Sequence, residues 1–584
     1  MMVPTRYGSR MDGSRLTAQL LPFVWVIWTA ATGVLAARTL RDDVWPHAER
    51  RRGLWLVLGV SVSAVVATFF LPSRIDASGL MELSGGKEPW KGASGEALLG
   101  LIRAVVPLSH EDIIHLTRAW LVPTCALAMA ASRGQIQGPA LGTIAGVDVR
   151  RVAMVGVLLA TPSFLFGVLG VFNFWFFCSL VLAMLLAWDD LTRSPAWASR
   201  ISLLSSVALL GFARPETIVG GIVMAALVAL FAWRRKDPKL LVPALVLLVA
   251  LCSVAPTIVA YLGERMRNQP LLTGADATGD ASIWMLPWIA LRRIVQHAPL
   301  NLLVLLVAFH AMGVLAVGRA WRMIRERRAS WPEVAAMALL LTEFAAIGVH
   351  REGFSRYIKY GQLLVVPSWF LAASVLGALP PTGKARVWLP ASVAAGLVVT
   401  LASVLISWLG YTRCSRPEGQ TFAARSRDET LLWNTAPRWA ESVCAPDRGQ
   451  GPVRVVVVGF DERAQTPGRD DEDMFGKPHC EPERWPIVHL LHGSGCWAAA
   501  AYPAADRSVE EVLFDPSHGV LCSGVPFDEL AQEPQRATHA IASYYAPARR
   551  NEIREAVERS ATCAWEIQEI TDSAVLLRRR EVGR

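Results

Sequence analysis

The sequence predicts an all-α polytopic membrane domain of about twelve transmembrane helices, followed by a small α/β domain. Three observations support this fold class. Hydrophobic residues make up 53% of the 584 residues and charged residues only 18%, which is too apolar for an ordinary soluble protein. Apolar runs of membrane-spanning length recur up to residue 410, and lipid favours helices because it offers the backbone no hydrogen-bonding partner. No such run follows, so residues 411–584 are predicted to form a soluble domain.

The predicted spans differ in how clearly they separate. Residues 152–188 form a nearly unbroken apolar run that we divide into two spans. Arg214 and Pro215 alone separate two later runs, which predicts a tight hairpin or a broken helix because proline removes a helical hydrogen bond. In chain order the predicted spans are 16–37, 53–72, 113–132, 152–170, 171–188, 199–213, 216–234, 239–262, 298–318, 332–350, 358–379 and 387–410.

The distribution of positive charge orients these spans, because cytoplasmic loops of membrane proteins are rich in Lys and Arg. One set of alternate loops contains 21 positive residues, whereas the other contains 12 although it includes the two longest loops. The first set is predicted to be cytoplasmic, which places the loop 73–112 and the domain 411–584 outside. Arg6, Arg10 and Arg15 disagree with the outer position that twelve spans give to the N-terminus, so the orientation of the first run stays open.

The soluble domain differs from the membrane domain in charge and in cysteine content. Its net charge is −6, so the basic pI of 9.2 comes from the membrane loops, which argues against a nucleic-acid partner. An even number of cysteines in an oxidising compartment predicts up to three disulfides of open pairing. The six cysteines of this domain are Cys414, Cys444, Cys480, Cys496, Cys522 and Cys563.

The periodicity of the soluble domain predicts alternating strands and helices. Buried strands are expected at 453–460, 486–491 and 519–527, and helices at 428–442, 507–514 and 551–560. The end of the chain alternates on both sides of a short polar turn, which predicts a closing hairpin. His492-Gly-Ser-Gly495 lacks the pattern of a hydrolase nucleophile and is interpreted as a turn.

Acidic residues of the outer loops are the first candidates for a functional site. Asp76 is the first acid after a span, and the small residues Ala77, Ser78 and Gly79 follow it. That position would let its carboxylate point back over the membrane surface and act as a general base on a hydroxyl. For most outer acids, including Glu82, the alternative interpretation is a solvated loop with helix-capping acids.

Two charged residues fall within predicted spans. Arg118 lies several residues into the third span and Glu343 about two turns from the outer end of the tenth. A charge inside a bilayer is costly unless it is paired or faces a watery cavity, so both are functional candidates. The alternatives are a mutual salt bridge and an Arg118 side chain that extends to the membrane surface.

The stretch 76–130 resembles the first outer loop and following span of the GT-C glycosyltransferase superfamily. The similarity is to the branch that contains protein O-mannosyltransferases and bacterial lipopolysaccharide sugar transferases. Its elements, in order, are Asp76, the small-residue patch MELSGG, the amphipathic run EPWKGASGEALLGLIRAVVPL, and Glu111 ahead of Arg118. GFARPE at 211–216 is similar to the Arg-Pro pair that ends a middle span in this family. Arg356-Tyr357 with the Pro-bearing run 363–367 resembles a late motif.

The resemblance covers roughly residues 53–380 and implies sugar transfer from a polyprenyl-phosphate-linked donor to an acceptor outside a bacterial cytoplasmic membrane. It implies that Asp76 is the base and that basic residues hold the lipid phosphate: Arg118, Arg214, Arg351, Arg356 and Lys359. The residues assigned to substrate binding are Glu82, Glu111, Asp112, Glu343 and Tyr357. The acceptor is a glycan, a lipid or a protein.

The sequence departs from the family at one point that bears on a metal. Ala77 follows Asp76 where the family often has a second acid, so participation of a divalent metal ion stays open, with His110, Glu111 and Asp112 as alternative ligands. No other cofactor is indicated. The rival functions are a transporter, which the lack of an internal repeat disfavours, and a lipid-glycan ligase or polymerase, which would need acids in a late outer loop.

Overall fold

The structure is a computed structural model of residues 1–584. The residues that it describes are 12–44, 51, 55, 59, 74–75, 93–106, 116, 118–136, 138, 140–144, 146–161, 163–164, 170–171, 176–194, 196–213, 217–268, 298–348, 362–379, 388–399, 402, 435–444, 453–459, 487, 491, 494, 496–501, 538–543, 547–559, 565–571 and 574–579.

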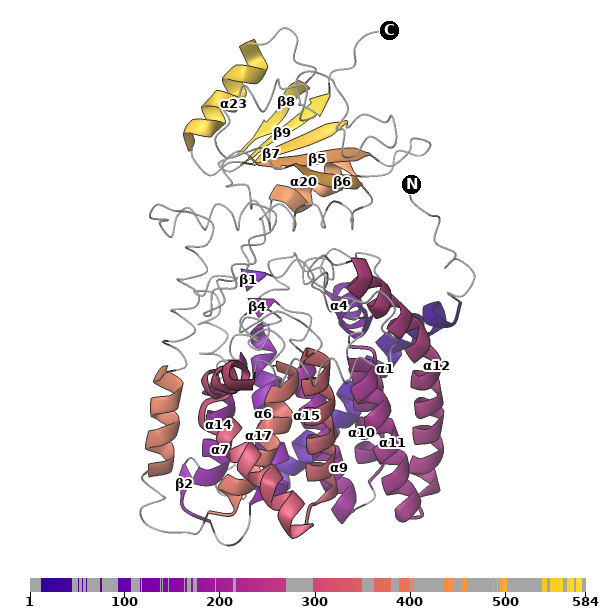
Figure 1. The fold of residues 1–584 in the computed structure, drawn as a ribbon, viewed down its shortest axis with the longest axis vertical. Helices are drawn as coiled ribbons and strands as arrows, with labels where there is room; N and C mark the ends of the chain where they lie inside the picture. Colours follow the sequence, from indigo (N-terminus) through magenta and orange to yellow (C-terminus); the bar gives the residue numbers. More distant parts are fainter. Residues whose placement is uncertain are drawn as a thin grey trace.

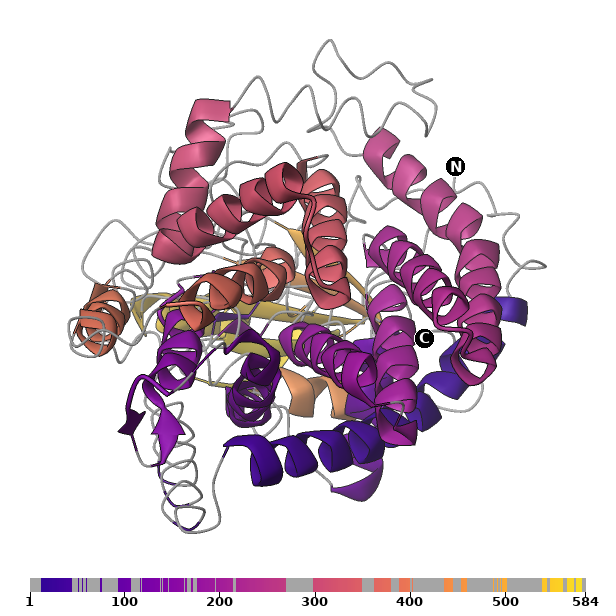
Figure 2. The ribbon, with the colours of Figure 1, turned by 90° about the horizontal axis from the view of Figure 1, so that it is seen from below.

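Helices dominate the described residues up to 402, and they pack side by side in one bundle (Figures 1 and 2). A further helical stretch, 388–399, packs on the bundle through Val393, whose side chain meets Gly156. The helices are α1 (Asp12–Thr39) with the π-helix η1 (Leu40–Val44), α4 (Ala93–Val105), α6 (Leu121–Ala131), α7 (Val149–Leu159), α9 (Phe177–Arg193), α10 (Trp197–Gly211), α11 (Ile218–Arg234), α12 (Pro238–Asn268), α14 (Ala298–Glu326), α15 (Trp331–Gly348) and α17 (Gln362–Gly377).

Most predicted spans coincide with a helix, but the prediction of one span over 152–170 is wrong. There α7 ends at Leu159, two residues before Thr161-Pro162, and a short strand β4 (Gly170–Val171) follows. Proline within an apolar run ends the helix because its ring blocks the preceding turn. By length and composition, two helical stretches of the described residues could cross a membrane, Leu20–Val44 and Pro238–Ala255.

Ion pairs between arginines and aspartates connect the helices at one end of the bundle, which we call the Asp190 end. Asp190, near the end of α9, accepts hydrogen bonds from Arg38 of α1 at 2.6 Å, from Arg133 at 3.4 Å and from Ser199 of α10. Arg133 also pairs with Asp43 at 3.1 Å. Segments that the sequence assigns to one side of the membrane thus meet at one end.

The opposite end, which we call the β1 end, contains a short strand pair and the start of α9. Strand β1 (Arg74–Ile75) pairs in parallel with β4, with Arg74 opposite Gly170. Ser179 in the first turn of α9 accepts the indole N–H of Trp120 at 2.8 Å. Because α9 is 17 residues long, the two ends are separated by roughly 24 Å.

A seam of hydrogen bonds joins α1 to α10 between these ends. Trp28 donates its indole N–H to the hydroxyl of Ser206 at 2.8 Å, and the hydroxyls of Thr32 and Ser202 lie 2.7 Å apart. All four side chains are buried. Where neighbouring surfaces are equally apolar, such side-chain hydrogen bonds give two helices a specific register.

Residues 435–579 contain a five-stranded sheet in the order β6-β5-β7-β9-β8. The three strands β6, β5 and β7 are parallel, and β9 and β8 form an antiparallel hairpin. Two helices accompany the sheet (Figure 1). The elements are α20 (Ala436–Val443), β5 (Arg454–Gly459), β6 (Trp497–Ala501), β7 (His539–Ser543), α23 (Pro547–Arg559), β8 (Trp565–Ile570) and β9 (Ala574–Arg579).

The sheet confirms part of the sequence prediction for this region and corrects another part. The strand expected at 453–460 is β5, and the closing hairpin is β8 with β9. The strand expected at 486–491 is wrong, because Ile487 and Leu491 are helical. Strands β6 and β7 were not predicted, because WAAAA and HAIAS have few of the β-branched residues that favour strands. The predictions at 507–514 and 519–527 lie outside the described residues.

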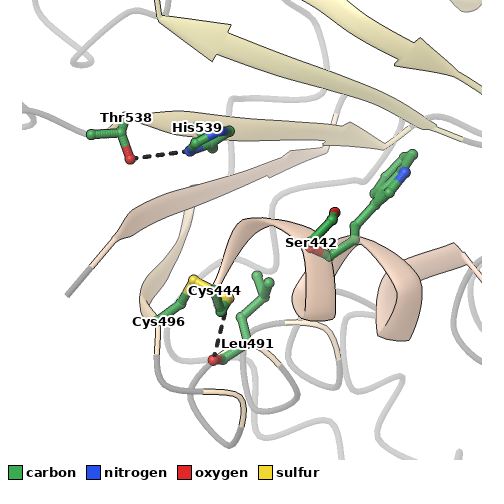
Figure 3. Close-up of a disulfide and its surroundings, with 7 residues drawn as sticks. Ser442, Cys444, Leu491, Cys496, Thr538 and His539 are labelled. Carbon is green, nitrogen blue, oxygen red and sulfur yellow. Dashed lines mark hydrogen bonds between the residues drawn. A yellow bond between two sulfur atoms is a disulfide. The ribbon is translucent and has the colours of Figure 1, made fainter. Parts of the chain in front are cut away.

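A disulfide joins Cys444, which follows α20, to Cys496, which precedes β6 (Figure 3). Both half-cystines are buried in the core between α20 and the sheet, and the backbone N–H of Cys496 donates to the carbonyl of Leu491 at 3.0 Å. Trp439 of α20 donates its indole N–H to Glu569 of β8 at 2.8 Å. Helix α20 is therefore attached near both edge strands of the sheet, β6 and β8. The other four cysteines of this region lie outside the described residues.

Replacement of Asp190 by Asn should lower the unfolding temperature of the detergent-solubilised protein. The carboxylate is 3% exposed, and its loss leaves Arg38 and Arg133 without their shared anion, a change that costs about 3 kcal/mol for a buried pair. Asp42→Asn is the matched control, because Asp42 and its partner Arg41 are exposed. Equal unfolding temperatures for the two variants would contradict a stabilising role of the Asp190 ion pairs.

Acidification should destabilise the sheet through His539. Burial, together with Arg578 opposite on β9, lowers the pKa of His539 from 6.5 to about 4. The folded chain resists protonation that the unfolded chain accepts, so this contribution to stability is complete above pH 6.5 and is lost as the pH falls toward 4. Calorimetry of the full chain across this range should show a weaker pH dependence for His539→Gln, and an unchanged dependence would exclude His539 as its source.

Candidate functional site

The candidate site lies at the β1 end of the bundle, where the first predicted outer loop meets the break between α10 and α11. Helix α4 belongs to that loop and is amphipathic, with Leu98 and Leu99 buried and Val105 exposed. The sequence had predicted an amphipathic run here, and α4 confirms it. The two-residue strand β1 ends directly before Asp76 in the chain.

Helix α4 is fixed at its first turn by hydrogen bonds to the end of α10. The Ser94 hydroxyl donates to the carbonyl of Leu209 at 2.8 Å, and its backbone N–H donates to the carbonyl of Phe212 at 3.1 Å. The Ser94 carbonyl accepts the indole N–H of Trp25 from α1 at 2.7 Å. A helix end leaves carbonyls without intrahelical partners, and Ser94 satisfies two of them in a buried place. The loop is thereby held against the bundle.

The α10–α11 break is a tight hairpin that depends on two glycines. A Cβ built on Gly221 would lie 2.6 Å from the Cα of Gly211, and a Cβ built on Gly211 would lie 2.6 Å from Leu251 Cδ2, so a side chain at either position would collide with its neighbour. Thr217 closes the turn by donating its hydroxyl to the carbonyl of Leu210 at 2.7 Å. The tight-hairpin alternative of the sequence prediction is therefore confirmed, and the residues 214–216 within it lie outside the described residues.

Arg118 lies just before α6 and is 1% exposed. The neighbouring indole of Trp120 is hydrogen-bonded to Ser179 at the start of α9, which places this segment at the β1 end. Burial of a guanidinium costs free energy, so buried arginines occur where the charge binds a ligand or pairs with another group of the protein. The structure therefore agrees with the interpretation of Arg118 as embedded in the bundle and excludes an extended side chain that reaches the surface.

Glu343 of α15 is fully buried, and its carboxylate lies against the first turn of α11. A Cβ built on Gly220 would lie 2.5 Å from Glu343 Oε1 and 3.1 Å from Leu339 Cδ1. The amide dipoles of a helix create a positive potential at its N-terminus, which favours a carboxylate there by about 0.3–2 kcal/mol. Gly220 thus provides the space for a buried negative charge beside the α10–α11 hairpin.

Arg118 and Glu343 are the two predicted site residues that the structure describes, and both are buried in the bundle. Their roles toward a substrate stay predictions. Ser94, Gly220 and the Gly211–Gly221 contact were not predicted; the sequence signal for the glycines is a small-residue pair directly after the Arg-Pro break. The other predicted site residues lie outside the described residues: Asp76, Glu82, Glu111, Asp112, Arg214, Arg351, Arg356, Tyr357 and Lys359.

The described residues contain no group of three or more His, Cys, Asp or Glu side chains that could hold a metal ion. The candidate ligands His110, Glu111 and Asp112 are outside that part of the chain. Participation of a metal thus stays an open prediction of the sequence.

Comparison with known proteins finds similarity to solved structures. No protein-family model matches the chain, and no curated protein matches it. Among solved structures, the chain is similar to ArnT from Cupriavidus metallidurans, crystallised with undecaprenyl phosphate bound. The likeness covers 90% of this chain and 97% of that one, at 13% identity and a TM-score of 0.43.

Replacement of Gly220 by Ala should disturb the buried carboxylate of Glu343. The new methyl group would overlap Oε1, so the carboxylate must leave the N-terminus of α11, at a cost of about 1–3 kcal/mol. The unfolding temperature of the purified protein should fall accordingly. Gly318→Ala in α14 is the control, since nothing lies within 4 Å of its built Cβ and alanine favours a helix. A Gly220→Ala protein as stable as the control would show that Glu343 has room to move.

Proposed function

We propose that the chain is a multi-pass membrane glycosyltransferase that transfers a sugar from a polyprenyl-phosphate-linked donor to a hydroxyl group of an extracytoplasmic acceptor. The observation that carries the proposal is Arg118, a guanidinium buried at the end of the bundle where the loop containing Asp76 begins and is held by α4. A buried cation next to an anchored acidic loop suits the transfer of a group away from a phosphate.

The proposed reaction needs a base and a cation on opposite sides of the transferred sugar. Asp76 would take the proton of the acceptor hydroxyl while the hydroxyl oxygen attacks the anomeric carbon of the donor sugar. The bond from that carbon to the phosphate oxygen would break, and the configuration at the anomeric carbon would be inverted. The polyprenyl phosphate leaves with added negative charge. A guanidinium in a low-dielectric surrounding binds phosphate by two parallel hydrogen bonds and stabilises that charge.

The bundle supports two further parts of this proposal. Arg118 would supply the phosphate-binding cation from the start of α6, with Arg214 in the adjoining hairpin as a second one. Glu343, which lies beside the first turn of α11, would accept hydrogen bonds from sugar hydroxyls. Arg351, Arg356, Tyr357 and Lys359 follow α15 in the chain and would complete the donor site.

The proposed base is tested by replacing Asp76 with Asn, which keeps the shape of the side chain but cannot accept a proton. Loss of a general base lowers a rate by about 10²–10⁴-fold. Transfer of radiolabelled sugar from polyprenyl-phosphate donors should be measured in membranes that contain equal amounts of wild-type and variant protein. Asp280→Asn, in another predicted outer loop, is the matched control and should retain activity. Full activity of the Asp76→Asn protein would refute the assignment.

A further inference from the structure

Four exposed tryptophans lie at the Asp190 end, and we call them the tryptophan girdle: Trp197, Trp233, Trp321 and Trp388. Each is between 61% and 70% exposed. An indole is large and mostly apolar, so a surface with several exposed indoles at one level is unfavourable in water. It is favourable where hydrocarbon meets lipid headgroups, because the ring lies in the apolar layer and its N–H reaches a polar group.

Contacts of neighbouring residues place two members of the girdle at the Asp190 end. Trp197 begins α10, two residues before Ser199, which donates to Asp190. Trp233 lies in the last turn of α11, two residues before Arg235, which donates to the carbonyls of Leu191 and Thr192 at the end of α9.

The other two members are placed in the same way. Trp321 and Arg319 lie near the end of α14, and Arg319 pairs at 2.7 Å with Glu333 in the first turn of α15, the helix that Trp331 begins. The ring of Trp331 lies under the guanidinium of Arg234 at the end of α11. Trp388 begins a helical stretch that runs parallel to α7, because Val393 meets Gly156 and Gly396 meets Ala160. Arg151 in the first turn of α7 donates to the carbonyl of Asp43 at 3.3 Å, so α7 starts at the Asp190 end and Trp388 lies at that end too.

Apolar side chains continue from the girdle toward the middle of the bundle. Val242, Val246 and Val249 form an exposed stripe on α12, and Val314 and Val317 form another on α14. Their spacing of three and four residues keeps each stripe on one face of its helix. The girdle therefore borders a surface suited to acyl chains.

Basic side chains lie near the girdle, in the turns α9–α10, α11–α12 and α14–α15 and at the helix ends that flank them. Within the described residues of these turns, the exposed acid is Glu326, whereas Asp237 is partly covered and pairs with Arg200 at 2.9 Å. The exposed basic residues are Arg193, Arg234, Arg235, Lys236, Lys239, Arg322, Arg325, Arg327 and Arg328. The surface around the girdle is thus strongly positive.

We propose that the tryptophan girdle and these basic turns bind the headgroups of anionic phospholipids. Along the bundle surface, exposed apolar side chains are followed by indoles and then by guanidinium or ammonium groups. This sequence matches the acyl chains, glycerol backbone and phosphates of a lipid leaflet. Basic residues at such a surface attract anionic lipids strongly, while a zwitterionic headgroup offers no net charge to attract. The proposal does not depend on glycosyl transfer, because it concerns the opposite end of the bundle.

The test measures lipid selectivity of the full-length protein in phosphatidylcholine bilayers. Spin-labelled phosphatidylglycerol or phosphatidylcholine is added in trace amount, and the fraction immobilised by the protein is compared. We expect phosphatidylglycerol to be preferred by about threefold, and the preference to shrink at high salt, because these charges face water. An equal immobilisation of the two lipids by wild-type protein would overturn the proposal, and is the result expected if the surface instead binds an acidic protein.

Charge-removing variants locate the effect. The combined change Arg322→Gln, Arg325→Gln, Arg327→Gln and Arg328→Gln should reduce the preference by about half or more. The control removes the same charge from α23 by Arg549→Gln, Arg550→Gln, Arg554→Gln and Arg559→Gln and should leave it unchanged. If the first variant does not fold, Arg234→Gln with Lys236→Gln and Lys239→Gln takes its place. A preference that survives in the folded variants, or falls equally in the control, would contradict the assigned surface.

Discussion

The carboxylate of Asp190 is the interaction on which the arrangement of the first helices depends. Four elements meet at it: α9 carries it, α1 and the turn after α6 supply Arg38 and Arg133, and α10 supplies Ser199. These segments are up to 152 residues apart in sequence and would otherwise meet through apolar side chains that give little preference for one register. Hydrogen bonds of defined length and direction select that register, and the Trp28–Ser206 and Thr32–Ser202 contacts extend it along α1 and α10.

A fixed register at the Asp190 end determines what the β1 end can present. Because α1 and α10 are held along their length, Trp25 and Leu209 arrive where Ser94 can bond to both segments, and α4 is anchored there. The same register brings Gly211 to Gly221 and leaves a space at Gly220 for the Glu343 carboxylate. The two ends therefore differ in kind. One end is stabilised by arginine–carboxylate pairs, and the other combines a loop held by backbone hydrogen bonds with embedded Arg118 and Glu343.

Some of these features can be predicted from the sequence and others cannot. Runs of apolar residues located most helices, and Arg214-Pro215 indicated the α10–α11 hairpin, because both signals are local. The apolar run around Pro162 predicts one long span although α7 ends just before this proline, and sequence pattern does not locate β6 because alanine has no strand preference of its own. Asp190 and Ser94 were not identified, since their importance comes from partners more than a hundred residues away, which no single-sequence pattern reveals. Burial of Arg118 was foreseen only because a charge inside a span is conspicuous.

Two features favour the same orientation of the bundle in the membrane. The girdle and its basic turns favour an anionic leaflet at the Asp190 end, as expected of a cytoplasmic face. The stretch 388–399 leads the chain from that end toward the β1 end, and no apolar run of spanning length follows residue 410, so the sheet domain is predicted to lie on the β1 side. Its Cys444–Cys496 disulfide suits an oxidising compartment, whereas Cys125, Cys178 and Cys252 within the helices are free thiols. The orientation that both features favour puts the acidic loop and Arg118 on the outer side, as the sequence predicts and as the proposed transfer to an extracytoplasmic acceptor requires.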